Sequence, residues 1–140
     1  MIRVDVELRE SVGRFFGTIL TEGRASSDRR ELFVLGSCTW PSDGISLLDT
    51  HNGRTLARVW PMRRNNGEIR ISTQATAAIR EAVESKPYMS VEFHCLRENR
   101  TQSNIREIER ALVVAAALVK SPSYSQTSAE IRSLRRRRWI

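Results

Sequence analysis

Short runs of strand-forming residues recur along this chain, and several of them alternate apolar with polar side chains. Alternation places the apolar side chains on one face of an extended strand, which predicts a sheet with one buried face. Glycine, proline and asparagine separate the runs, and the Asn66-Gly67 pair is typical of a hairpin turn. The polar stretch at residues 21–30 predicts an exposed loop. The predicted strands span residues 2–8, 14–20, 31–36, 55–62, 68–72 and 88–96.

One segment has the features of a helix from beginning to end. Thr73 or Thr76 can cap it, apolar residues follow at helical spacing, and Pro87 stops it. The alanine-rich segment at residues 105–119 is ambiguous, because its apolar residues fit one face of a helix and also fit a buried strand. Its alanines favour the helix. A further short helix is predicted to begin near Ser128.

Together these elements predict a single mixed α+β domain that is mainly β. We expect a small closed or strongly curved, mostly antiparallel β-barrel with one or two flanking helices. Gly17, inside a predicted strand, indicates a bulge or the close approach of another backbone. With 140 residues, of which 40% are apolar and 28% charged, the chain is long enough to bury a core and is not expected to be disordered.

Several classes of protein are disfavoured by what the sequence lacks. No run approaches the roughly 20 apolar residues of a membrane span. The first ten residues hold acids where a signal peptide has an apolar core, so we expect a cytosolic protein. Cys38 and Cys95 lie far apart and without zinc-ligand spacing, so we expect two free thiols, no metal and no cofactor. The motifs of α/β-hydrolases, P-loop proteins and zinc proteases are absent.

The stretch YMSVEFH, residues 88–94, carries the most suggestive side chains. In a strand, Ser90, Glu92 and His94 project from one face. A hydroxyl, a carboxylate and an imidazole together suggest catalysis, and the same residues also fit an ordinary solvated face. A serine needs an adjacent base to act as a nucleophile, and His51 is the other histidine of the chain. Ser90 and His51 meet only if their strands lie side by side or cross.

Five stretches occur in the same order as in a known family. They are GRFFGTIL, RRELFVLGSCTW, ISLLDTHNGRTLARV, GEIRISTQATAAIREAVESKPYMSVEF and ERALVVAAALVKSPSY. In this order, between Gly13 and Tyr124, the chain resembles the caudovirus prohead proteases, capsid-maturation serine proteases that share their fold with herpesvirus assemblins. The resemblance implies a protease-like β-barrel domain over residues 1–124, followed by a basic helix or tail over residues 125–140. It also implies a strand at residues 105–119, and we adopt the strand there.

The resemblance implies roles for two residues. His51 matches the general base of the family, and Ser90 matches the nucleophile that attacks a peptide carbonyl. Two positions depart from the family pattern. Glu92 stands where the family has glycine, and the carboxylate that completes the triad falls on Ala115, which cannot orient an imidazole.

Three residues are candidates for the role that alanine cannot fill. They are Glu92, Asp49 and His94, and the last is of interest because assemblins use a histidine as their third member. A Ser-His dyad and an inactive enzyme are the alternatives.

We therefore expect a serine endopeptidase of phage capsid maturation, acting inside the immature capsid in the host cytoplasm. Its partner would be a scaffold protein or the scaffolding segment of the major capsid protein. Homo-oligomers are one option for its oligomeric state, which the sequence leaves open, and no membrane binding is expected. An inactive relative with a structural role in assembly, or a basic nucleic-acid-binding module, is the alternative. The net charge is +7, and the basic tail predicts contact with DNA or an acidic capsid surface unless it is merely solvated. The arginines concerned are Arg135, Arg136, Arg137 and Arg138, beside Trp139.

Overall fold

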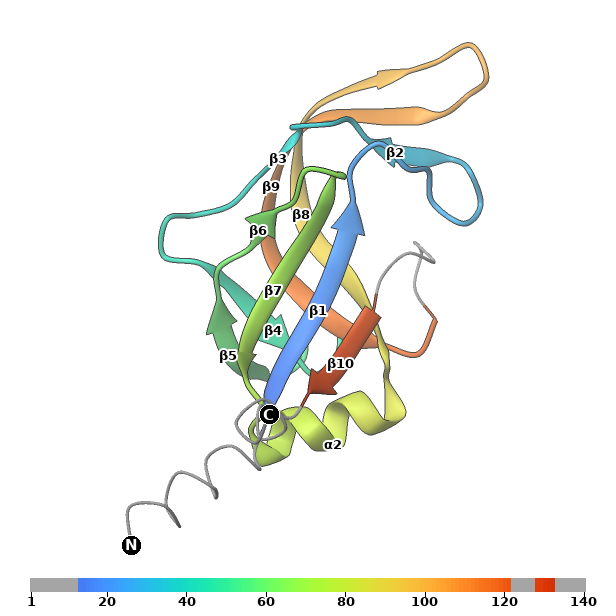
Figure 1. Cartoon of the computed structure of the whole chain (residues 1–140). Helices are drawn as coiled ribbons and strands as arrows, with labels where there is room; N and C mark the ends of the chain where they lie inside the picture. Colours follow the sequence, from blue (N-terminus) through green and yellow to red (C-terminus); the bar gives the residue numbers. More distant parts are fainter. Residues whose placement is uncertain (1–12, 122–127, 133–140) are drawn as a thin grey trace, which may run out of the picture.

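The computed structural model describes residues 13–121 and 128–132 (Figure 1). These residues are mainly β with one helix, as predicted. In chain order the elements are β1 (Arg14–Thr21), β2 (Glu31–Phe33), β3 (Cys38–Thr39), β4 (Ile45–Leu48), β5 (Thr55–Val59), β6 (Met62–Arg63), β7 (Glu68–Gln74), α2 (Ala77–Ser85), β8 (Tyr88–Arg100), β9 (Arg106–Val119) and β10 (Ser128–Arg132).

The first sheet is antiparallel and has the strand order β10-β1-β7-β6. The predicted hairpin joins β6 to β7. Its turn is closed by the N–H of Gly67, which donates to the carbonyl oxygen of Arg64 at 3.0 Å. Gly67 has φ +90°, a conformation that glycine adopts at little cost. The Asn-Gly pair therefore marks the turn correctly.

The second sheet is built around β9, the longest strand. On one edge β9 pairs antiparallel with β8 from end to end, and the two form a long hairpin, here called the β8–β9 ribbon (Figure 1). On the other edge three short strands, β2, β3 and β4, pair parallel with successive sections of β9. The last of these, β4, then pairs antiparallel with β5. One long strand thus aligns segments from much of the chain.

The closed barrel of the prediction is not found among the described residues, whose strands form two separate sheets. Closure would need a ladder of backbone hydrogen bonds between the sheets. The N–H of Ala129 donates to the carbonyl oxygen of Pro87 at 3.0 Å, which brings β10 to the start of β8 without forming such a ladder. The sheets are instead joined through a shared apolar core.

The helix favoured by the alanines of residues 105–119 is wrong, and the strand implied by the resemblance is confirmed. Ile108, Val113, Ala116 and Leu118 have no exposed surface. Strand pairing on both edges of β9 supplies hydrogen bonds and burial that a local helix propensity of a few tenths of a kcal/mol per residue does not outweigh. The register of β9 against β8 shifts between Ala115 and Val113, which indicates a bulge there.

The short helix predicted near Ser128 is also wrong. Residues 128–132 form β10, which pairs antiparallel with residues 14–18 of β1. This pairing satisfies backbone groups at the edge of β1, which an isolated helical turn would leave open. The strand predicted at residues 2–8 and the arginine run after residue 132 lie outside the described residues.

The helix predicted between Thr76 and Pro87 is confirmed as α2. Thr76 is its N-cap, and the side-chain oxygen accepts a hydrogen bond from the N–H of Ile79. Ile79 and Ala82 are the buried residues on its inner face, and the helix ends at Ser85, two residues before Pro87. In Figure 1 the helix lies across the end of the molecule where β1 begins.

Gly17 makes room for the Met89 side chain of the second sheet, rather than for another backbone as predicted. A Cβ at this position would lie 2.6 Å from Sδ of Met89, far inside van der Waals contact. Met89 and Phe15 are fully buried beside it, so β1 crosses β8 at short range. Met89 therefore marks the buried face of β8, and the opposite face of the strand is turned away from the core.

Candidate catalytic site

The outer face of β8 carries the three polar residues predicted for it. Met89 is fully buried, and Val91 and Phe93 pack against the core, so these residues define the inner face of the strand. Ser90 and Glu92 occupy the alternate positions and are half-buried. His94 follows on the same face and is exposed.

A tight loop at residues 49–53, here called the His51 loop, connects β4 to β5. The Asp49 carboxylate accepts a hydrogen bond from the N–H of Arg54 at 3.0 Å, which closes the loop on itself. A Cβ on Gly53 would lie 2.3 Å from this carboxylate, so the closure requires glycine. Asn52 has φ +57°, a conformation that asparagine tolerates better than most residues. The loop therefore has a defined shape that presents His51.

Three contacts hold the His51 loop against neighbouring elements. Nδ1 of His51 lies 2.9 Å from Oε2 of Glu92. The same carboxylate oxygen accepts a hydrogen bond from the N–H of Asn52 at 3.2 Å. From the end of α2, the ammonium group of Lys86 donates to the carbonyl oxygen of Asp49. The loop and the outer face of β8 are thus brought together as the sequence predicts.

Glu92 lies beside the position of Ala115, where the resemblance places a carboxylate. In the antiparallel pair of β8 and β9, Glu92 stands directly opposite Ala115. Directly opposed residues in such a pair have their Cβ atoms about 4.5–5.5 Å apart. The Glu92 carboxylate therefore lies close to the region that a longer side chain at position 115 would occupy.

Small residues lie under the site. Ala115 and Ala117 form a buried cluster with Leu48, apart from the main core. Ser90 is paired with Ala117, so the hydroxyl stands next to the smallest side chain of β9 after the bulge. Ala115 is 5% exposed and Ala117 has no exposed surface, so both side chains are covered.

The predicted site residues are not all in contact. Among the residues that the structure describes, no hydrogen bond joins Ser90 to His51 or His94 to either of them. Because Nδ1 of His51 faces Glu92, Nε2 is the ring nitrogen left for a hydroxyl. The Asp49 carboxylate is used by Arg54 inside the loop. Of the three candidates for the third member, Glu92 is the one that contacts His51.

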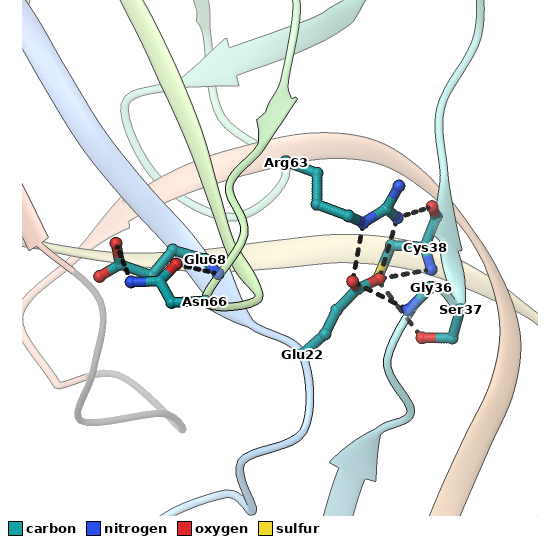
Figure 2. Close-up of polar contacts among 7 residues, drawn as sticks. All are labelled: Glu22, Gly36, Ser37, Cys38, Arg63, Asn66 and Glu68. Carbon is teal, nitrogen blue, oxygen red and sulfur yellow. Dashed lines mark hydrogen bonds and ion pairs between the residues drawn. The ribbon is translucent and has the colours of Figure 1, made fainter.

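A second charged cluster was not predicted from the sequence. Glu22 lies in the stretch expected to be an exposed loop, yet its side chain has no exposed surface. Its Oε1 accepts from the Gly36 N–H at 3.0 Å, and its Oε2 accepts from the Cys38 N–H at 2.9 Å (Figure 2). Arg63 donates to both oxygens, at 2.8 and 3.0 Å. We call these four residues the Glu22 cluster.

The electrostatics of the Glu22 cluster are those of a closed structural site. Burial by itself raises the pKa of Glu22, but hydrogen bonds from Arg63, Cys38 and Gly36 outweigh it, so the pKa lies below its ordinary value. Burial raises the pKa of the Cys38 thiol to about 12, which makes the thiol unreactive near neutral pH. Cys38 and Cys95 are both free, as predicted.

Neither a metal-binding group of side chains nor a membrane-spanning helix is found among the described residues. Within those residues, no group of three or more histidine, cysteine, aspartate or glutamate side chains is arranged to hold a metal ion. The described helix is also too short and too polar to cross a membrane.

Comparison with known proteins leaves the resemblance untested. No family model, no curated protein and no solved structure matches the chain. The assignment to the prohead proteases, and the roles it gives to Ser90 and His51, therefore stay predictions.

Proposed function

We propose that this protein is a serine endopeptidase of capsid maturation, with Ser90 as nucleophile, His51 as general base and Glu92 as the residue that orients the base. The contact between Nδ1 of His51 and Oε2 of Glu92, at 2.9 Å, is the observation that carries the proposal. It supplies the carboxylate that the sequence comparison leaves missing, on the same strand face as Ser90.

The geometry of this contact matches what the chemistry requires. A carboxylate on Nδ1 holds the neutral imidazole with its proton on Nδ1, so that Nε2 is free to accept a proton. In the proposed mechanism Nε2 takes the Ser90 proton as Oγ attacks the peptide carbonyl. His51 then gives that proton to the leaving amine, and water hydrolyses the acyl-enzyme by the same route in reverse. Glu92 stabilises the imidazolium in both steps.

The substrate follows from the resemblance alone. We propose the scaffold protein, or the scaffolding segment of the major capsid protein, inside the immature capsid. The assemblin-like barrel belongs to the same proposal.

A fluorophosphonate probe tests the nucleophile directly, because it forms a covalent bond with an activated serine. We expect the wild-type protein to be labelled at Ser90, as located by mass spectrometry of its peptides. Ser90→Ala should remove the label. Ser103→Ala, which deletes an exposed hydroxyl in the turn between β8 and β9, is the matched control and should keep it. Labelling that persists in Ser90→Ala would show that the assignment is wrong.

The second candidate function is that of an inactive relative that serves as a structural component of the particle. Two observations favour it. Ser90 and His51 are both described, and no hydrogen bond joins them. Glu92 also accepts from the N–H of Asn52 at 3.2 Å, so it can serve simply to hold the His51 loop in place. A folded wild-type protein that takes no label would support this candidate over the enzyme.

A further inference from the structure

The outer face of the first sheet carries a groove that the proposed catalytic site does not use. It lies over β1, β7 and β6, encloses about 490 Å³, and is lined chiefly by Arg14, Phe16, Trp60, Met62, Arg64 and Arg70. We call it the Trp60 groove. Its floor is aromatic and apolar, and its rim is basic. Ser90 and His51 are not among its lining residues.

Trp60 is exposed and yet held in a defined orientation. The residue is 58% exposed, an unusual value for the largest side chain. Its indole N–H donates to the carbonyl oxygen of Ser42 at 3.1 Å. The ring also packs on the turn at Gly44, where an added Cβ would lie 3.1 Å from a ring carbon. An indole held in this way offers a fixed aromatic surface to solvent.

The rim of the groove is positively charged. Arg14 is oriented by its Nε–H, which donates to Oγ of Ser72 at 2.6 Å. Arg70 contacts the Glu68 carboxylate at 2.7 Å, and this acid compensates part of the rim charge. Arg64 is exposed at the turn between β6 and β7. Three guanidinium groups therefore surround the aromatic floor, and one neighbouring carboxylate compensates only part of their charge.

We propose that the Trp60 groove binds a short stretch of single-stranded nucleic acid. A base would stack on the indole of Trp60, and the arginines would contact the flanking phosphates. This pairing of a fixed aromatic surface with basic side chains is how proteins bind single strands without reading their sequence. The net charge of +7 attracts such a polyanion to the protein.

An acidic peptide is the competing ligand, and the groove is less suited to it. A peptide that adds to a sheet needs a long free strand edge for its main-chain hydrogen bonds. The strand at the edge of the groove, β6, has two residues. Stacking and phosphate contacts need no such edge, so the nucleic acid is the ligand that the groove favours.

The test is the binding of a fluorescein-labelled oligothymidylate, measured by anisotropy over a range of salt concentrations. For the wild type we expect log K to fall with log salt with a slope of about −2, since three arginines neutralise phosphates of a single strand at about −0.7 each. Trp60→Ala should weaken binding about tenfold or more, because stacking is lost. Trp60→Phe should restore part of it. Arg64→Ala should reduce the slope by about 0.7.

Matched controls separate the groove from the rest of the basic surface. Leu96→Ala and Arg97→Ala remove an exposed apolar and an exposed basic side chain from the β8–β9 ribbon, and both should leave binding unchanged. Replacing the four arginines at 135–138 by serine should leave the dependence on Trp60 intact. The proposal would be overturned if Trp60→Ala and Arg64→Ala bound the oligonucleotide as tightly as the wild type. It would also be overturned if an acidic peptide displaced the oligonucleotide at lower concentration. Thermal unfolding of each variant checks that it is folded.

Discussion

The Glu22 cluster and the Glu92–His51 contact use the same chemistry in two different environments. In each, a glutamate binds a basic side chain and also accepts hydrogen bonds from backbone N–H groups of a neighbouring segment. The Glu22 side chain is fully buried and the Glu92 side chain is 25% exposed, while the basic partners, Arg63 and His51, are 38% and 42% exposed. The exposure of the carboxylate to solvent, and not its contact with a basic side chain, distinguishes the structural site from the candidate reactive site.

The two sites also differ in what is left over for chemistry. Both oxygens of Glu22 accept hydrogen bonds, and the neighbouring Cys38 thiol is held uncharged by burial. Around Glu92 the contacts converge on Oε2, and the imidazole still has a ring nitrogen beyond the contact. A closed cluster stabilises the fold, while an open one keeps a group available for a substrate.

The largest effect on stability is expected at Glu22. Glu22→Ala leaves the N–H groups of Gly36 and Cys38 without an acceptor and removes the carboxylate partner of Arg63. The free energy of unfolding should therefore fall by about 3–5 kcal/mol. Urea denaturation measures this change. Glu68→Ala, which deletes an acid that contacts Asn66 and Arg70 at the surface, is the matched control and should cost less than about 1 kcal/mol. Equal losses at the two positions would refute the contrast.

An intermediate effect is expected in the reactivity of the two thiols. With its pKa at about 12, Cys38 carries roughly a thousandth of the thiolate of an ordinary cysteine at pH 8. In a Cys95→Ser variant, the rate at which Ellman's reagent modifies Cys38 should therefore equal the rate at which the protein unfolds. Cys38→Ser isolates Cys95, which is half-buried and should react without unfolding. Two thiols that react at one rate would show that the Glu22 cluster is not closed.

The smallest effect on stability is expected at Glu92. Glu92→Gln keeps an acceptor for the N–H of Asn52 and removes the charge beside a part-exposed histidine, so the cost should be about 0.2–1 kcal/mol. The rate of fluorophosphonate labelling should nevertheless fall by at least about tenfold, because the imidazolium loses its carboxylate. A loss of stability as large as that of Glu22→Ala, with labelling unchanged, would make Glu92 a purely structural residue.

Local patterns in the sequence predict the parts of the fold that local forces determine. Alternation along residues 88–94 correctly places Ser90 and Glu92 on one strand face, and the cap at Thr76 and the stop at Pro87 bound the helix. The contact of Glu92 with His51 spans 41 residues, and the sequence offers Glu92 as one of three candidates for it without choosing among them.

The failures involve contacts between distant parts of the chain. Glu22 resembles a surface residue because its partners are 14, 16 and 41 positions away, at Gly36, Cys38 and Arg63. The alanines of β9 favour a helix locally, and pairing with four other strands overrides them. No periodicity within a short window contains that information.

The central place of β9 has a consequence for how the protein is made. The side chains of Glu31 and Arg106, on β2 and β9, form an ion pair across 75 positions of sequence. At about 5–20 residues per second, a ribosome takes roughly 4–15 s to synthesise the intervening chain. Throughout that interval β2, β3 and β4 lack the strand on which they assemble. During that time their unpaired strand edges can pair with those of other nascent chains unless chaperones cover them.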